Sequence, residues 1–458
     1  MQFHRGAFAA ALTAVALAMS VHTSRAAAPS AQASRSLAPG ETVLQDGLTV
    51  VVRRATLSPT AALQVWIVCP SDGYGPPKPG LARLTALGVV GTKVGGVSLR
   101  DAVRAAGGEL MVSVFPSSTE IAVLAPAGEI DALADTLFAR VLHPVIDDLG
   151  FREAKLRLAE QQAVALSSAD VVLRDGIFGH LFADGPFHVS TYGTPNELRA
   201  LTLVEAQGFT AQAYVPDSEV VVAVGGLDET AMLARVGRAA PIPVSPTAMP
   251  PSGRGPVSSQ PVPVGAADDA GVALGWVGPP ATDERSSTAM DFLSDYLTRP
   301  DSGTVARAVK AADPDGTFSG QFITLRNAGV FYMTVTGGKK SPNAMADAMR
   351  AAIKPLLDAP MSPRDFARAL ETFRTHTLRD AQTPQQLADN YGWYFAQGDA
   401  AYAPSVTSME LSGAYYSQLA ALTPRAVYDA ARTYLGSTPV TATVAPRPQS
   451  SVTTSFRQ

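Results

Sequence analysis

The chain has 458 residues but only one cysteine, Cys69. A single thiol excludes an internal disulfide, a CxxC redox pair and a cysteine-rich zinc site. Cys69 ends the apolar run Leu63–Cys69, which predicts a buried strand. We therefore expect an inert core thiol rather than a reactive one.

Charge is also scarce. Charged residues make up 17% of the chain, the formal net charge is −4, and no basic run occurs. A mildly acidic chain of this kind is a poor ligand for nucleic acid, so we expect no nucleic-acid partner. Hydrophobic residues make up 46%, which excludes disorder throughout and supports two to four domains with apolar cores.

Long apolar runs are absent except near the N-terminus. The basic segment Met1–Arg5 precedes the apolar run Gly6–Val21, and small residues at Ser24-Arg25-Ala26 offer a cleavage site. This pattern predicts a signal peptide over residues 1–26 and secretion to the bacterial periplasm. The alternative is that the leader is kept as an anchor, although the run is shorter than the ~20 residues that a span needs. We expect no membrane span in the mature chain.

The mature chain divides at a stretch rich in proline, serine and glycine, Ile242–Pro263. Such a composition cannot continue a helix or a central strand, so it predicts an extended linker. The predicted organisation is a flexible lead-in (27–40), an N-terminal domain (41–241), the linker (242–263), a C-terminal domain (264–446) and a disordered tail (447–458).

The two predicted domains repeat one order of elements: strand, helix, hairpin, several helices and a closing strand. In the first, alternating residues at Glu109–Phe115 and Thr119–Ala125 predict the hairpin. In the second, Thr317–Leu325 and Val330–Thr336 form the matching pair. The sequence therefore predicts an α+β fold in which two similar domains stand in tandem.

Several short segments carry a family resemblance because they occur together in one order. They are Asp46–Val51, Gly80–Leu87, Ala106–Glu109, Gly185–Phe187 with Tyr192–Thr194, and Tyr214–Asp217 with Val221–Gly226. This set resembles the M16 metallopeptidases, the insulinase or pitrilysin family, in its two-domain form. The resemblance covers essentially the whole mature chain and implies two M16-type α+β domains.

The family's catalytic signature, HxxEH on a helix, is lost. Two histidines at i and i+4 would hold zinc on one helix face, and the glutamate would activate the metal-bound water. The matching positions hold Arg83, Ala86 and Leu87. Glu160 stands where the resemblance places the distant glutamate ligand, and it is otherwise an ordinary helix-surface carboxylate. Arg83 pairing with Glu160 in the vacated site is a further hypothesis.

A second family element, an arginine and a tyrosine seven residues apart, holds substrate and stabilises its oxyanion. The matching region, Ser302–Gly320, has no such pair. Arg307, Lys310 and Phe318 are its candidate substrate contacts. Tyr332, on the following strand, is expected to be a packing residue.

No other metal or nucleophile motif stands out. None of the four histidines beyond residue 26 lies three or four residues from another. His180 and His188, with Asp184 between them, form a non-specific candidate cation site. We therefore predict no catalytic residue, no metal ligand and no cofactor in this chain.

The resemblance implies a zinc-less subunit of a periplasmic zinc-protease complex. Such a chain would form a heterodimer with a zinc-bearing M16 chain, which carries HxxEH, and would help to enclose peptides or unfolded protein. The alternatives are a stand-alone peptide-binding or scaffold protein, and an active metallopeptidase with an unconventional site.

Overall fold

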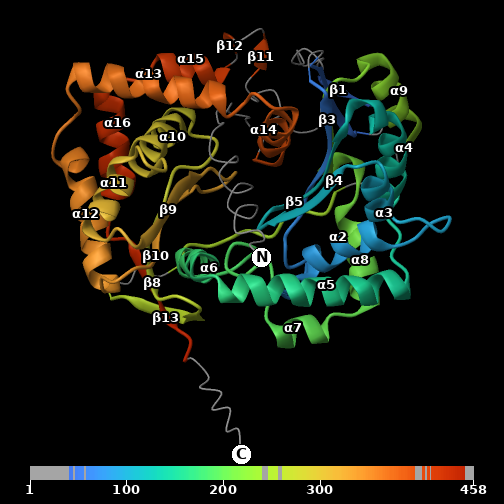
Figure 1. Cartoon of the computed structure of the whole chain (residues 1–458), viewed down its shortest axis with the longest axis horizontal. Helices are drawn as coiled ribbons and strands as arrows, with labels where there is room; N and C mark the ends of the chain where they lie inside the picture. The colour runs from blue at the N-terminus through green and yellow to red at the C-terminus, as the bar shows by residue number, and fades with distance from the viewer. Residues whose placement is uncertain are drawn as a thin grey trace, which may run out of the picture.

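The computed structural model describes residues 41–44, 47–55, 58–239, 246–255, 260–397, 405–407, 410–412 and 414–448. The predicted leader, lead-in, Asp46 and the tail beyond residue 448 lie outside these ranges. The described chain forms two α+β halves, each with its own sheet, placed side by side (Figure 1).

The first half contains β1 (Glu41–Val43), β2 (Thr49–Arg54), β3 (Thr60–Val68), α2 (Leu81–Gly91), α3 (Leu99–Ala105), β4 (Glu109–Phe115), β5 (Ser118–Pro126), α4 (Ile130–Val141), α5 (Asp148–Ser167), α6 (Ala169–Leu181), α7 (Pro195–Ala200), α8 (Leu203–Ala213), β6 (Glu219–Gly225) and α9 (Glu229–Ala239).

The strands of the first half form one sheet in the order β1-β2-β6-β3-β5-β4. Strands β2 and β6 are parallel, and the other neighbours are antiparallel. The predicted hairpin forms as β4 and β5, with Phe115 paired to Ser118. Strand β4 therefore lies at the edge of the sheet.

The second half contains β7 (Val262–Ala267), β8 (Gly271–Val277), α10 (Glu284–Thr298), α11 (Thr304–Ala312), β9 (Gly316–Ile323), β10 (Val330–Gly337), α12 (Pro342–Asp358), α13 (Pro363–Arg379), α14 (Pro384–Gln397), β11 (Ser405–Thr407), β12 (Glu410–Ser412), α15 (Ala414–Ala420), α16 (Pro424–Ala430) and β13 (Val440–Pro446).

The second sheet repeats the topology of the first. Its order is β7-β13-β8-β10-β9, with β7 and β13 parallel and the other neighbours antiparallel. Strand β9 therefore occupies the edge position that β4 has in the first sheet. The predicted fold class, two similar α+β units in tandem, is confirmed.

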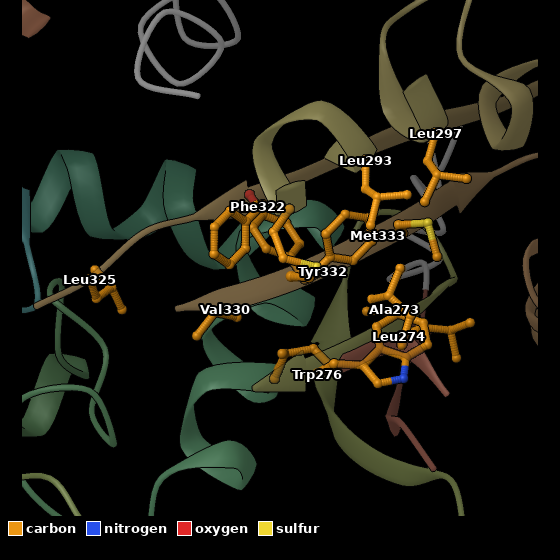
Figure 2. Packing of buried hydrophobic residues seen from close by; sticks show 14 of the residues in the cluster. Ala273, Leu274, Trp276, Leu293, Leu297, Phe322, Leu325, Val330, Tyr332 and Met333 are labelled. Carbon is orange, nitrogen blue, oxygen red and sulfur yellow. The ribbon is translucent and has the colours of Figure 1, made fainter. Parts of the chain in front are cut away.

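Aromatic and aliphatic side chains from both layers fill the second core. Figure 2 shows Trp276 on β8, Phe322 on β9 and Met333 on β10, with Leu293 and Leu297 of α10 packed over them. All five are buried. Burying side chains of this size stabilises the fold by about 1.5–3 kcal/mol each relative to exposure, before chain entropy is subtracted.

In each half, one helix packs against the sheet of the other half. Helix α6 follows α5 in the first half but packs on β8, β10 and β13 of the second sheet. Helix α14 does the reverse and packs on β3 and β6 of the first sheet. The two helices hold equivalent places in their halves, so the exchange is reciprocal, and α14 is visible between the sheets in Figure 1.

Because of this exchange, the two units are joined by packing as well as by the segment predicted as a linker. Residues of both halves share one continuous apolar core, in which Trp66 and Val222 of the first sheet join Phe331 of the second. The segment 246–255 is also tied down: Ala183 N–H donates to Gly253 O at 2.9 Å and Gly255 N–H to Leu181 O at 2.8 Å. Strand β7 begins at Val262, inside the predicted linker.

Within the described residues, no helix is both long enough and apolar enough to cross a membrane.

Candidate functional site

Helix α2 carries the three positions that match the zinc motif, and it is buried along its whole length. It begins after Gly80, whose φ of +86° is in the left-handed region. A Cβ at Gly80 would meet the Tyr192 carbonyl oxygen at 3.0 Å, so this turn requires glycine. The motif helix is therefore retained in the fold although its side chains have changed.

Arg83 turns away from Glu160 and lies on an aromatic ring. Its guanidinium carbon is 4.0 Å from the centre of the Tyr192 ring. Its Nη2 donates weak hydrogen bonds to Val114 O at 3.3 Å and Thr191 Oγ1 at 3.4 Å. Burial lowers the pKa of Arg83, and Tyr192 opposes that effect. The hypothesis that Arg83 pairs with Glu160 is thus wrong.

Leu87 and Glu160 share a separate hollow. Its described lining includes Arg100, Leu110 and Arg157. Glu160 lies on an exposed face of α5, and no ion pair joins it to another described residue. Glu160 thus borders the same hollow as Leu87, which lies one helical turn from Arg83.

Arg83 instead opens into a pocket of about 160 Å³ between the halves. The first half contributes the end of β4, part of α6 and the segment around Thr191. The second half contributes Gln321, Phe322 and Ile323 at the end of β9, and Trp393 of α14. Both sheet edges and both exchanged helices thus meet at this pocket.

The pocket is polar at one end. Asp175 Oδ1 receives a hydrogen bond from Arg174 Nη2 at 3.2 Å, and its Oδ2 receives one from Ser190 Oγ at 2.6 Å. Burial alone would lower the pKa of Arg174, but Asp175, Tyr332 and Asp170 outweigh it and raise that pKa. Arg174 and Arg83 therefore both stay charged at neutral pH.

The predicted substrate-contact residues lie elsewhere. Arg307 and Lys310 are exposed on α11, where Arg307 donates to Ser302 O and Lys310 to Pro314 O. Phe318 is half-buried on β9. Tyr332 is buried, and its hydroxyl accepts a hydrogen bond from Gln321 Nε2 at 2.7 Å, as a packing residue would. Arg307 lines a different hollow, beside His376.

The donor set does not fit a zinc ion. None of the three motif positions offers a lone pair to a metal, because they hold the guanidinium of Arg83, the methyl group of Ala86 and the isobutyl group of Leu87. His180 and His188 each bind a backbone carbonyl through Nδ1, those of Gly176 and Phe182. In the part of the chain that the structure describes, no three histidine, cysteine, aspartate or glutamate side chains gather closely enough to hold a metal.

Comparison with known proteins finds one family model, which matches part of the chain. Residues 200–373 match the family model described as the peptidase M16 inactive domain. A search of curated proteins gave no match. The family match, together with the solved structures below, confirms the resemblance to M16 metallopeptidases.

Three solved structures share the fold over nearly their full length. A protease from Helicobacter pylori has a TM-score of 0.76 and 16% identity, covering 89% of this chain and 99% of that one. A peptidase M16 inactive domain from Pseudomonas fluorescens has a TM-score of 0.72 and 16% identity, with 89% and 98% covered. A putative M16-like peptidase from Alicyclobacillus acidocaldarius has a TM-score of 0.73 and 18% identity, with 89% and 97% covered.

Residues 200–373 are thus similar to an inactive M16 domain, and the chain as a whole has the fold of the M16-like structures. The pocket residues Arg174, Asp175, Gln321 and Trp393 were not predicted from the sequence. They are distant in the chain and carry no spacing motif. They meet because α6 and α14 cross between the halves.

Proposed function

We propose that this chain is a non-catalytic subunit of a periplasmic M16 zinc protease and pairs with a chain that carries HxxEH. The observation that carries the proposal is the state of α2. Its glycine cap and full burial are kept, while Arg83, Ala86 and Leu87 leave it without a zinc donor or a base. A chain of this form would supply fold and surface, and its partner would supply the metal and the chemistry.

An apolar stripe on α5 supports a partner surface. Leu149, Leu156 and Val164 are 52%, 68% and 58% exposed. Helical spacing puts them on the same face as Glu160. Large exposed apolar side chains in one row are a feature of protein–protein contact sites. We propose that the zinc-bearing chain covers this stripe.

The periplasmic setting rests on residues 1–26, whose sequence has the form of a signal peptide. If the leader is removed on export, the N-terminus of the secreted protein lies close to residue 27. Mass spectrometry of the protein recovered from periplasm would locate that end, and a full-length mass from the membrane fraction would instead indicate an anchor.

Co-purification from the native periplasm tests the pairing. A tagged chain should retain a second chain with HxxEH, and metal analysis should find about one zinc per complex but none in this chain alone. Leu156→Arg should weaken retention of the partner. Ala351→Arg, on the exposed face of α12 in the other half, adds the same charge and should not. A zinc-loaded isolated chain would contradict the proposal, as would equal effects of the two variants.

The second candidate, a stand-alone peptide-binding protein, is favoured by the pocket between the halves. That pocket is complete within this chain and contains two arginines beside aromatic walls. A homodimer or monomer that binds peptides and ignores an available zinc-bearing chain would support this second function.

A further inference from the structure

The pocket between the halves has more positive than negative charge. Its charged lining residues among those described are Arg83, Arg174 and Asp175. Asp175 is engaged by Arg174. Arg83 has no carboxylate within ion-pair distance in the described chain, and its Nε has no hydrogen-bond partner although the residue is only 6% exposed. A buried charge of this kind is costly unless an anion pairs with it.

The remaining walls are apolar and aromatic. Phe178 and Phe187 line the pocket. Phe115 and Trp393 line it too, and their two ring centres are 5.1 Å apart. A volume of about 160 Å³ is close to that of an engineered cavity, about 150 Å³, that holds benzene. The pocket therefore fits one aliphatic or small aromatic group joined to an anion.

Two sheet edges that no other described strand pairs with lead to the pocket. Strand β4 ends the first sheet and β9 ends the second, and both contribute lining residues. The outer backbone N–H and C=O groups of an edge strand can pair with an extended peptide. An extended chain that ran along β4 would reach Val114 and Phe115, which border Arg83. The geometry thus favours a chain end over a free small acid.

We propose that this pocket binds the C-terminal residue of a peptide, with its free carboxylate accepting hydrogen bonds from Arg83 and Arg174 and its apolar side chain against Phe178 and Phe187. The inference rests on the peptide-binding part of the proposed function and names the ligand that this part takes. It requires neither zinc nor a partner chain.

A matched pair of peptides tests the carboxylate. The probes are acetyl-Ala-Ala-Ala-Leu with a free C-terminus and the same peptide as its C-terminal amide. Binding to the whole mature chain is measured by calorimetry and by tryptophan fluorescence, since Trp393 lines the pocket. We expect the free acid to bind about tenfold or more tightly than the amide, because charge-assisted hydrogen bonds to arginine are lost in the amide.

Variants locate the effect. Arg174→Gln and Arg83→Gln should each abolish most of the preference for the acid. Arg104→Gln is the matched control, since that side chain is exposed on α3 and pairs with Asp101. Gel filtration and circular dichroism establish that each variant is folded. If Arg83→Gln does not fold, Arg174→Gln and the acid–amide comparison on the unmodified chain decide the question.

The outcomes separate the alternatives. Equal binding of acid and amide, or no binding of either, overturns the proposal. 4-Methylpentanoate, which keeps the leucine side chain, its α-carbon and the carboxylate without a peptide, should bind far more weakly. If this small acid bound as tightly as the peptide, the proposal that the ligand is a peptide would be overturned. Failure to co-purify a zinc-bearing chain would refute the subunit role and leave an observed acid preference standing.

Discussion

At the residue scale, the side chains of α2 decide whether the helix can hold a metal. Positions 83 and 87 are one helical turn apart and lie on one face. Leu87 already shares a hollow with Glu160. The backbone arrangement that a two-histidine site needs is therefore present, and substitution at three positions tests it.

The variant Arg83→His with Ala86→Glu and Leu87→His should gain zinc affinity. Two imidazoles at i and i+4 together with Glu160 supply three ligands, the number usual in catalytic zinc sites. We expect about one zinc per chain by metal analysis, and a melting temperature that rises when zinc is added.

Glu160→Gln on the same background is the control and should weaken zinc binding. A folded triple variant whose zinc content equals that of the unmodified chain would show that α2 and α5 do not bring these three side chains around one metal ion.

A second prediction at this scale concerns Cys69. The thiol is fully buried beside Thr119, and burial raises its pKa to about 12. A protonated, inaccessible thiol is a poor nucleophile. In the native protein at pH 8, Ellman's reagent should therefore release almost no product within an hour, and one equivalent should appear in denaturant. Rapid reaction of the native chain would show that the end of β3 opens readily.

At the element scale, the sequence predicted what local chemistry encodes. Thr194 and Glu197 have the spacing of a capping box, and both of its reciprocal hydrogen bonds form at the start of α7. The hairpin around Pro116 to Ser118 formed because alternation and turn residues agreed. No helix was predicted within Ser302–Gly320, and α11 lies there.

Long-range packing could not be predicted from local patterns. Apolar periodicity locates the buried face of α6 or α14 but does not say which sheet covers it. For this reason the sequence indicated two domains and a linker but not the apolar core that both halves share. The candidate pocket was missed for the same reason, since α6 and α14 carry Arg174 and Trp393 to it.

The contact of α14 with the first sheet requires a glycine. A Cβ at Gly392 would overlap the indole ring of Trp66, which is fully buried. Gly392→Ala should therefore destabilise the protein by about 1–3 kcal/mol in denaturant unfolding, the usual range for overpacking.

Gly208→Ala on α8 is the matched control. A Cβ there meets nothing within 4 Å, so the higher helix propensity of alanine should stabilise the protein by about 0.5–1 kcal/mol. If both substitutions had the same sign, the close approach of α14 to Trp66 would be refuted.

The same contact contains a pair of acids. Gln64 Nε2 donates to Asp389 Oδ1 at 2.5 Å, and Trp66 Nε1 donates to Gln64 Oε1 at 2.8 Å. Burial raises the pKa of Glu120 well above its ordinary value, and the nearby Asp389 raises it further. Burial also raises the pKa of Asp389, to about 6. Protonation of the pair therefore favours the folded state.

Because both pKa values are higher in the folded than in the unfolded chain, this stabilisation is complete below about pH 4. It is lost as the pH rises through about 6. The free energy of unfolding should fall between pH 5 and pH 8 by about 1 kcal/mol or more through this pair. Glu120→Gln should flatten that dependence, whereas Glu109→Gln on the exposed end of β4 should not. An unchanged slope in Glu120→Gln would exclude the pair as its source.

At the scale of the whole molecule, the exchange of α6 and α14 makes the two halves interdependent. Each sheet is covered on one face by a helix that the other half supplies. Removing one half would expose the apolar residues that the exchanged helix buries, including Leu173 and Ile177 of α6. The covalent connection between the halves is consequently not what holds them together.

Cleavage of that connection tests this view of the molecule. A site for a specific protease inserted between Thr247 and Ala248 lies where side chains are exposed, before the hydrogen-bonded residues Gly253 and Gly255. After complete cleavage, we expect the fragments to elute together at the volume of the uncut protein and to separate only in denaturant. The shared core, rather than the peptide bond, then maintains the association. Separation of two folded halves in native buffer would instead support independent domains on a hinge. The pocket would then be lost on cutting, because residues of both halves line it.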